Sequence, residues 1–481
     1  MKKIKILILI TAIITSAAML LSGCGQNNEG TDVSGKTGTT AQADTSVWLD
    51  TSDMFTDRDL TADYDDTATK LELSDGNPEV KITEAGTYVI SGSTSDGSIT
   101  VDVSDDDKVQ IVLSGVSVTS KTGAALYVKS ADKVFITLAD GTKNTLANGG
   151  AFGGDDDSID GAVFSKSDIV FGGSGTLTVI STAAHGIVGK DDVKITGGTY
   201  EITCGSHGID ANDSIRITGA SLTITAGKDG LHCDNTEDSS KGFIYIKSGE
   251  LSINADDDGI HATTTLQTDG GTLNIKAAEG LEATRVIIND GTISIEASDD
   301  GINAAKKFDG ITPIVQINGG KITIVMGPGD TDGVDSNGDI IINGGTVDVT
   351  GNSSFDYDGT GTINGGTVIV NGEEVTTLPN QFMGGPGGNM GGGPGGMRGG
   401  TEGNPPSDVI TSATPEADGN GENGTFSPPG NFSERPQMPD SDSTDRNKNG
   451  TFPQKPGFGF GGNKNADGDN TVRPERPDKN T

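Results

Sequence analysis

Two consecutive stretches of 21 residues decide the fold: DGIHATTTLQTDGGTLNIKAA at residues 258–278 and EGLEATRVIINDGTISIEASD at residues 279–299. Each begins with an acidic residue followed by Gly, and each has two short runs of alternating apolar residues around a turn rich in Gly and Asp. Gly suits turns that need a positive φ, and the β-branched residues beside it suit strands. The two stretches are therefore copies of one strand–turn–strand repeat.

The same repeat continues through the middle of the chain, where an acidic residue or His followed by Gly recurs every 21 to 32 residues. These anchor pairs are Asp160-Gly161, His185-Gly186, His207-Gly208, Asp229-Gly230, Asp258-Gly259, Glu279-Gly280, Asp300-Gly301 and Asp332-Gly333. About 21 residues are too few for a crossover helix but enough for two or three short strands. The sequence therefore predicts an all-β fold, a right-handed parallel β-helix (a solenoid) with Val, Ile and Leu stacked inside.

The β-helix is expected to span residues 47–378. Apolar residues such as Leu273 and Ile275 alternate with Thr, Ser, Asn and Lys, so each strand has one dry face and one wet face. The segment 45–66 holds the only Trp and lacks this alternation. We expect it to form an N-terminal cap over the open end of the solenoid, which otherwise exposes edge strands.

The first residues carry a targeting signal. Three Lys among the first five residues precede an apolar run at residues 6–21 that is short for a membrane span. The sequence Leu21-Ser22-Gly23-Cys24 then resembles a bacterial lipobox, in which Cys24 becomes the lipidated first residue; an uncleaved signal anchor is the alternative. We therefore expect a signal peptide at residues 1–23, a flexible tether at 24–46, and a protein secreted and held at the extracellular face of the cell membrane by lipid alone.

The composition changes after residue 378 to a tail rich in Gly, Pro, Asn and Ser, beginning with the run GGPGGNMGGGPGGMRGG. Few aliphatic residues remain there, so the tail at residues 379–481 cannot bury enough surface to offset its chain entropy. We predict that it is disordered. The chain as a whole has 69 acidic and 33 basic residues, a net charge of −36. This charge argues against nucleic acid and anionic lipid as partners and favours cations and neutral ligands, or anionic ligands bridged by a divalent ion.

Two of the three Cys belong to the repeats. Cys204 and Cys233 each lie two residues beyond an apolar strand residue, so both side chains are expected to point into the core. A disulfide between them is the less favoured alternative.

The repeat places carboxylates above one another, because adjacent coils of a β-helix lie roughly 4.7–4.9 Å apart. At that spacing two carboxylates repel by roughly 3 kcal/mol even in a surface-like dielectric. Either their pKa values rise or a hard cation lies between them, and Ca²⁺ suits carboxylate and amide oxygens. A polar residue also recurs three positions after each of the last six anchors, from His207 to Asp332. The candidate metal ligands form one set of Asp258, Glu279, Glu282, Asp300 and Asn303, a second of Asp330, Asp332, Asp335, Asp356 and Asp358, and a third of Asp210, Asp229 and Asp234.

Two other interpretations of the anchors stay open. An Asp before Gly also suits a turn in which the carboxylate accepts hydrogen bonds from local amides. The histidines could indicate zinc, but they spread over several repeats without an obvious cluster, which favours corner or stacking residues instead. These histidines are His185, His207, His232 and His261.

The chain also resembles a bacterial family of carbohydrate-binding β-helix lipoproteins over roughly residues 50–375. The segments that carry the resemblance are MFTDRDLTADYD (54–65), GTYVISG (86–92), VQIVLSGVSV (109–118), ADKVFITLADGTKNTL (131–146) and HGIDANDSIRITG (207–219). The resemblance implies a calcium-containing parallel β-helix that binds cellulose-like and polygalacturonate-like polysaccharides. It also implies a shape like that of pectate lyases without established lyase activity.

Three functions are therefore compared. The first is a calcium-dependent polysaccharide-binding protein without enzymatic activity, in which calcium bridges to uronate carboxylates. The second is a polysaccharide lyase, which needs a cation and a Lys or Arg as base. The third is a structural or adhesive surface protein in which calcium only stiffens the fold, and the aromatic content of 4% favours it somewhat. The candidate bases are Lys190, Arg216, Lys228 and Arg285.

Overall fold

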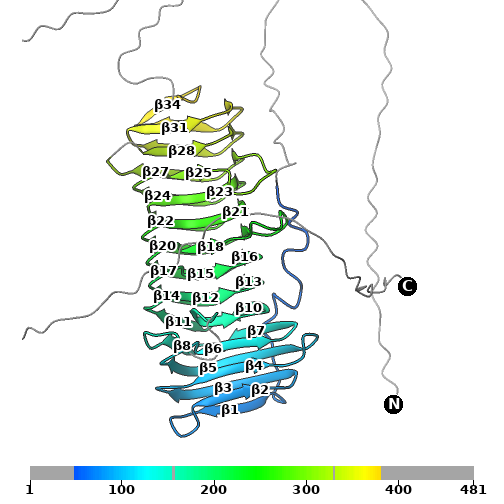
Figure 1. The fold of residues 1–481 in the computed structure, drawn as a ribbon. Coiled ribbons are helices and arrows are strands. Elements are labelled where there is room, and N and C mark those ends of the chain that lie inside the picture. Colours follow the sequence, from blue (N-terminus) through cyan, green and yellow to red (C-terminus); the bar gives the residue numbers. More distant parts are fainter. Residues whose placement is uncertain (1–47, 154–157, 329–330, 381–481) are drawn as a thin grey trace, which may run out of the picture. The chain divides into compact units, whose positions relative to one another are not determined.

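The computed structural model describes residues 48–153, 158–328 and 331–380, and every regular element in these ranges is a strand (Figure 1). The all-β prediction is therefore confirmed. The predicted signal peptide, the tether with Cys24, and the tail beyond residue 380 lie outside the described residues. Within the described part of the chain, no helix is long and apolar enough to cross a membrane.

The strands stack in three parallel ladders, because each strand pairs with its equivalents in the preceding and following coils. The first ladder contains β2 (Glu79–Ile82), β4 (Ser98–Asp102), β6 (Leu126–Ser130), β9 (Gly161–Ser165), β12 (His185–Gly189), β15 (Ile209–Ala211), β18 (Leu231–Cys233), the first parts of β21 (Asp258–Thr268) and β23 (Glu279–Ile288), β25 (Ile302–Ala304), β28 (Asp332–Ser336) and β31 (Ser353–Tyr357). The anchor residues lie at the corner that leads into this ladder.

The second ladder follows the first along each coil. It contains β1 (Thr69–Leu73), the first parts of β3 (Gly86–Thr94) and β5 (Lys108–Ser120), β7 (Lys133–Leu138), β10 (Asp168–Gly173), β13 (Asp192–Ile195), β16 (Ser214–Ile217), β19 (Phe243–Ile246), the later parts of β21 and β23, β26 (Ile314–Ile317), β29 (Asp339–Ile342) and β32 (Gly361–Ile363).

The third ladder completes the coil. It contains the later parts of β3 and β5, β8 (Lys143–Asn148), β11 (Thr176–Ser181), β14 (Thr199–Cys204), β17 (Ala220–Ala226), β20 (Gly249–Ala255), β22 (Thr272–Ala277), β24 (Thr292–Ala297), β27 (Lys321–Met326), β30 (Thr346–Thr350) and β33 (Thr367–Val370). β34 (Glu373–Val375) folds back antiparallel on β33. Asn371 and Gly372 form the turn between them with φ values of 51° and 85°, as two-residue hairpin turns require.

The core consists of apolar side chains stacked in register between coils. In the third ladder Leu251, Leu273, Ile293, Ile322 and Val347 pair in succession, and each is at most 1% exposed. Burying each such side chain contributes about 1.5–3 kcal/mol. This in-register stacking of parallel strands around one apolar core is consistent with the predicted β-helix.

Two kinds of glycine shape the coil. The turn glycines between the second and third ladders, such as Gly198 and Gly271, have φ values of 91° and 99°, as the sequence predicts. The anchor glycines differ, because lack of space excludes a side chain there. A Cβ on Gly280 would lie 2.3 Å from the carbonyl oxygen of Gly301 and 2.5 Å from Cγ2 of Ile295. The anchor glycines therefore let neighbouring coils approach one another.

We predict that Gly280→Ala destabilises the domain by about 1–3 kcal/mol, the usual cost of overpacking a filled site. Thermal or chemical unfolding measures this loss. Gly76→Ala is the matched control, because its added Cβ would meet only Ser74 Oγ at 3.9 Å. An equal, small effect of both substitutions would show that the coils do not need the glycine at the anchor corner.

Both cysteines of the repeats lie in the core, as predicted. Cys204 is 7% exposed and Cys233 is fully buried, and both are free thiols. Burial raises the pKa of the Cys204 thiol to about 11. The side chains therefore serve as small buried apolar groups.

The N-terminal strap, residues 48–61, follows the outside of the second ladder. The backbone amide of Leu49 donates to Gln267 Oε1 at 2.8 Å, and Met54 packs on the rings of Phe243 and Tyr245. Farther along, the guanidinium of Arg58 lies 4.4 Å from the centre of the Phe135 ring. The prediction that this segment caps the open end of the solenoid is therefore wrong for its described residues. Its side chains pack on the outer surfaces of several successive coils instead.

A buried ion pair fastens the strap. Asp59 Oδ2 lies 3.0 Å from Lys194 Nζ, and Asp59 Oδ1 lies 3.6 Å from Lys133 Nζ. The Asp59 side chain is fully buried and that of Lys194 is 5% exposed. Burial raises the pKa of Asp59, but the Thr56 amide and Lys194 outweigh it and hold this pKa below its usual value.

We predict that Asp59→Ala destabilises the domain by about 3–5 kcal/mol, because it leaves the buried Lys194 ammonium without its partner. Denaturant unfolding measures the loss. Asp57→Ala, on the exposed side of the same strap, is expected to change stability by less than about 0.5 kcal/mol. A similar small change for both variants would mean that the strap does not depend on this pair.

Candidate metal centre

Two columns of polar residues run along the corner between the third and first ladders. The anchor column holds His185, His207, Asp229, Asp258, Glu279, Asp300 and Asp332. The companion column lies three residues later on the first-ladder strands, in register from coil to coil, and holds Asp210, His232, His261, Glu282, Asn303, Asp335 and Asp356. Between the columns, each coil from Gly186 to Val334 buries a Gly and an Ile, Leu or Val, and the last coil buries Ser354 and Phe355. This burial leaves the two flanking side chains outside the core.

The anchor side chains also hydrogen-bond between coils. Asp229 Oδ1 accepts the backbone amide of Asp258 at 3.1 Å, and Asp300 Oδ1 accepts that of Asp332 at 3.2 Å. The turn interpretation expected local amides, whereas these amides belong to the next coil. Each of these carboxylates therefore keeps its second oxygen for another partner.

Three acids of the first predicted ligand set come together. Asp258, Glu279 and Glu282 each offer an oxygen, and the three oxygens lie within 4.8 Å of one another. Asn303 Nδ2 donates to Glu279 Oε2 at 3.0 Å, and Asp300 is the next residue of the anchor column. Asn303 Oδ1 is buried and accepts no hydrogen bond within the described residues. An oxygen in this position is available to a cation.

Two cations of the protein neutralise part of this set. His261 Nδ1 lies 2.9 Å from Asp258 Oδ2 and 3.0 Å from Glu282 Oε2. Lys307 Nζ lies 2.5 Å from Glu282 Oε1. Four carboxylates face Lys307 and His261, so the ionised set keeps two negative charges when the His261 ring is protonated, and these fall on Glu279 and Asp300.

The uncompensated carboxylates hold protons strongly. Burial, followed by the charge of Glu282, raises the pKa of Glu279 to about 8. Burial also raises the pKa of Asp300 to about 7, with Asp335 and Asp299 adding to the shift. Raised pKa values and a cation are the two solutions that the sequence predicts for stacked carboxylates, and the pKa values of Glu279 and Asp300 are raised.

The second predicted set is brought together in part. Asp335 pairs in register with Asp356, and burial together with Asp332 raises the pKa of Asp335 to about 6. Asp332 accepts a hydrogen bond from the Ser353 hydroxyl. Asp358 is close enough for its charge to raise the pKa of Asp335 further. Asp330 lies outside the described residues.

The third predicted set does not form an oxygen cluster, because each acid has another partner. Asp210 Oδ1 lies 2.6 Å from His232 Nδ1, and Asp229 Oδ2 lies 3.1 Å from His207 Nδ1. Asp234 Oδ1 accepts the Thr263 hydroxyl at 2.6 Å. Acids of this part of the columns are paired with histidines.

His185, His207 and His232 form a stack and His261 meets His232 edge-on, which agrees with the stacking interpretation for the first three rings but not with the expectation that the histidines stay apart. Their ring centres are separated by 5.0, 4.1 and 5.2 Å in the order His185, His207, His232 and His261. The sequence held the signal, because His207, Asp229 and His232 belong to consecutive repeats in the two columns. Only the register between coils shows which side chains of the anchor column contact which side chains of the companion column.

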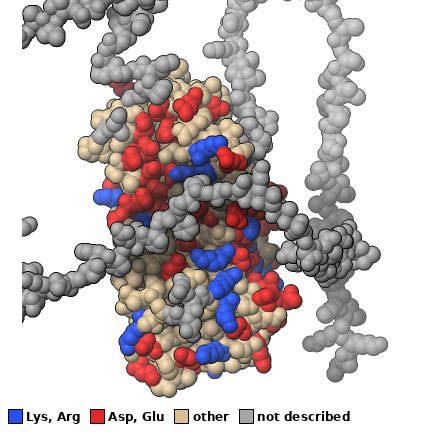
Figure 2. Space-filling view, in the orientation of Figure 1, with Lys and Arg blue, Asp and Glu red and all other residues tan. Residues whose placement is uncertain are grey.

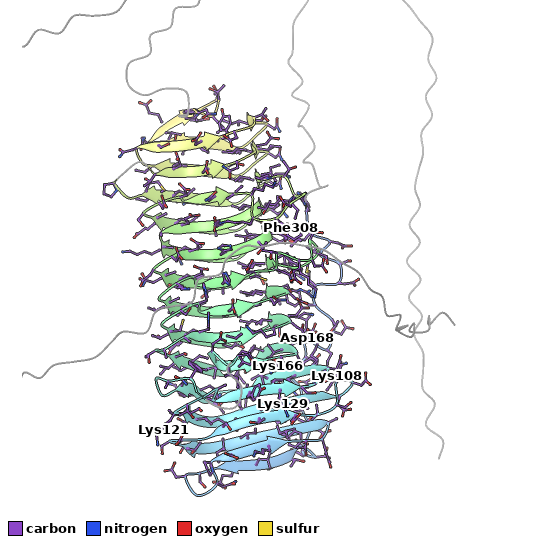
Figure 3. All side chains as sticks on the ribbon, in the orientation of Figure 1. Lys108, Lys121, Lys129, Lys166, Asp168 and Phe308 are labelled. Atoms are coloured by element: carbon purple, nitrogen blue, oxygen red, sulfur yellow. The ribbon has the colours of Figure 1, made fainter. Side chains whose placement is uncertain are left out.

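Two functional candidates escaped the sequence analysis. Lys307 and Phe308 belong to the loop of the longest repeat, between β25 and β26, and they line a small pocket with Thr236, Lys306 and Asp309. Phe308 projects from the side of the stack near β21 and β23 (Figure 3). Acidic side chains gather over the coils around β23 to β31, whereas Lys and Arg are more frequent over the coils near β7 (Figure 2). Lys307 and Phe308 therefore bring a cation and an aromatic ring close to the acid-rich part of the columns.

The predicted lyase bases differ in their surroundings. Arg216 is occupied, with its guanidinium 3.0 Å from Asp192 Oδ2 and lying over the Phe243 ring. Lys190 lies over the Phe164 ring, with Nζ 5.4 Å from the ring centre, and Lys228 is exposed. Burial lowers the pKa of Arg285, and its buried Nε has no hydrogen-bond partner in the described structure.

Stacked coils with an acid-rich outer corner define the class of this protein as an all-β repeat protein with a candidate cation-binding edge. Residues 76–331, just over half of the chain, match the family described as "Carbohydrate-binding domain-containing protein". The chain belongs to this family. A relative of the same description from Acetivibrio thermocellus is 41% identical over 249 residues, which are 51% of this chain and 82% of the relative.

Among solved structures, the chain is similar to the polysaccharide lyase-like protein from C. thermocellum, determined as a gadolinium derivative. The two are 30% identical, and the match covers 54% of this chain and 96% of the other. The TM-score is 0.40.

We predict that, in the presence of a chelator, the melting temperature falls as the pH rises from about 5 to about 8. Glu279, Asp300 and Asp335 have raised pKa values in the folded chain, so they stabilise it below the unfolded pKa values. That stability is lost as the pH rises through the folded values. Melting curves at a series of pH values measure the slope, and Glu279→Gln should flatten it. A melting temperature that stays level or rises over this range would contradict the prediction.

Proposed function

We propose that this protein is a cell-surface lipoprotein that binds polysaccharide, without enzymatic activity, through a calcium-containing right-handed parallel β-helix at residues 47–378. Membership of the carbohydrate-binding family is the observation that supports polysaccharide as the ligand. The lipobox sequence ending at Cys24 supports attachment by lipid to the extracellular face of the membrane.

Calcium is supported by the chemistry of the first ligand set. Glu279, Asp300 and the free Asn303 Oδ1 supply oxygens of the kinds that Ca²⁺ prefers, and Asp258 and Glu282 lie beside them. One divalent ion would balance the two negative charges that His261 and Lys307 leave. It would also remove the need for the raised pKa values of Glu279 and Asp300. Asp332, Asp335, Asp356 and Asp358 would hold a second ion.

The polysaccharide would bind across the same edge. A protein of charge −36 repels an anionic polymer, and calcium held by the columns would bridge to uronate carboxylates. Lys307 would add a direct contact with a uronate carboxylate, since its side chain stays 32% exposed although its ammonium group pairs with Glu282. The half-buried Phe308 ring would cover the apolar face of a sugar.

The central experiment is calorimetric titration of the purified full-length chain, first with Ca²⁺ and then with polygalacturonate. We expect Ca²⁺ to bind the chelator-treated protein, and glycan heat to appear only when Ca²⁺ is present. Glu279→Gln should weaken Ca²⁺ binding at least about tenfold, which corresponds to ~1.4 kcal/mol.

Glu296→Gln is the matched control, because Glu296 lies on the same coil but is exposed and pairs loosely with Lys276 at 3.9 Å. It should leave both affinities unchanged. Glycan binding that persists with the chelator would disprove the bridging role of calcium. A large calcium-dependent rise in melting temperature without any glycan binding would favour the structural or adhesive alternative.

A polysaccharide lyase is the second candidate, and Arg285 is the observation that favours it. Its pKa is lowered by burial and no carboxylate pairs with it in the described structure, as suits a group that accepts a proton. Lys307 is less suitable, because the bond from Glu282 outweighs burial and raises its pKa. Absorbance of unsaturated product during incubation with polygalacturonate separates the two functions.

A further inference from the structure

The histidine part of the columns differs chemically from the acid-rich part. His207 and His232 lie on successive coils, with ring centres 4.1 Å apart and ring planes within 17° of parallel. Between them the Asp229 carboxylate is buried, and its side chain is 4% exposed. The site therefore presents nitrogen as well as oxygen, which distinguishes it from the proposed calcium ligands.

The Asp210 carboxylate settles the tautomer of His232. His232 Nδ1 lies 2.6 Å from Asp210 Oδ1, a distance that requires a proton between the two atoms. Since a carboxylate is the weaker base, the proton stays on Nδ1. In the neutral ring, Nε2 then carries a lone pair, and it faces Asp229 Oδ2 at 3.9 Å. Carboxylates hold metal-binding histidines in the same way.

The Nδ1 atom of His207 approaches the same oxygen. It lies 3.3 Å from the backbone nitrogen of Asp229, which donates to it, and 3.1 Å from Asp229 Oδ2. The protonated ring donates to Asp229 Oδ2, whereas in the neutral tautomer whose Nδ1 accepts this amide, Nδ1 has no proton to offer the carboxylate. Two nitrogen lone pairs and one carboxylate oxygen then point toward one another, an arrangement that a cation stabilises.

We propose that His207 Nδ1, Asp229 Oδ2 and His232 Nε2 form a binding site for a divalent transition metal of the Zn²⁺ type, with Asp210 as the positioning residue. The three ligand atoms lie within 4.8 Å of one another. A tetrahedral Zn²⁺ needs separations of about 3.4 Å, which small ring rotations reach. Two imidazoles and a carboxylate leave a fourth position for water, and they suit Zn²⁺ far better than Ca²⁺.

The site ends at His232 on one side. His261 is held between Asp258 and Glu282, so its Nδ1 already has two carboxylate partners. On the other side, His185 Nε2 is 3.8 Å from Asp160, the anchor acid of the preceding coil. The triad adjoins the calcium ligands proposed above, because Asp229 accepts the Asp258 backbone amide and its carboxylate lies within 4.8 Å of ligand atoms of Asp258 and His261.

The test is a titration of the purified full-length chain with Co²⁺ and with Zn²⁺, in excess Ca²⁺ to fill oxygen sites. We expect one equivalent of Co²⁺ to give the visible absorption of a nitrogen-containing tetrahedral site, and Zn²⁺ to displace it. His207→Gln and His232→Gln should each weaken binding at least about tenfold. Asp210→Asn should weaken metal binding less, because it removes only the carboxylate that orients the His232 ring and leaves all three ligands in place.

His185→Gln is the matched control, since it removes a stacked imidazole outside the triad. Equal loss in this variant, or wild-type affinity in His207→Gln and His232→Gln, would overturn the proposal, as would the absence of Co²⁺ absorption. In that case Asp229 is an ion-pair partner only. If a variant fails to fold, the wild type decides: Zn²⁺ should protect His207 and His232, but not His185, from carbethoxylation measured by mass spectrometry.

Discussion

The close stacking of coils at the anchor corner is the constraint on which the rest of the structure depends. The anchor glycines leave no room for a Cβ, since the carbonyl oxygen of the next coil lies within 2.3–2.8 Å of its place in the glycines from Gly186 to Gly333. This contact keeps the three ladders in register and buries the apolar stack. It also forces whatever side chain precedes each glycine into a column.

A column of like charges at this spacing has to be neutralised, and the chain does so differently along its length. In the middle coils, histidines alternate with acids and pair with them, as His207 does with Asp229. In the later coils, His261 and Lys307 balance only part of the carboxylates, and raised pKa values hold the remainder. The two parts of one corner therefore offer different donor atoms, oxygens in the later coils and nitrogens with oxygen in the middle coils, and this difference is why we propose Ca²⁺ for the first and Zn²⁺ for the second.

The strap stabilises the stack of coils in a second way, in addition to the pairing of strands in neighbouring coils. Coils of a solenoid contact only their neighbours, so each junction along the axis depends on local pairing. The strap contacts successive coils from Gln267 to Gln110, and the buried Asp59 bonds Lys194 near the middle of this path. It therefore couples coils that do not touch one another.

The sequence by itself determined the repeat, the strand alternation, the buried cysteines and the approach of Asp258, Glu279 and Glu282, because all of these follow from spacing within one repeat or between adjacent ones. The later acids Asp335 and Asp356 follow by the same rule. Only the tertiary structure decided the course of the strap, since its contacts join residues as far as 218 positions apart, as with Leu49 and Gln267. It also decided that His207 and His232 converge on Asp229, and that Lys307 reaches Glu282. Those contacts depend on the register between coils and on loop conformation, and neither has a periodic signal in the sequence.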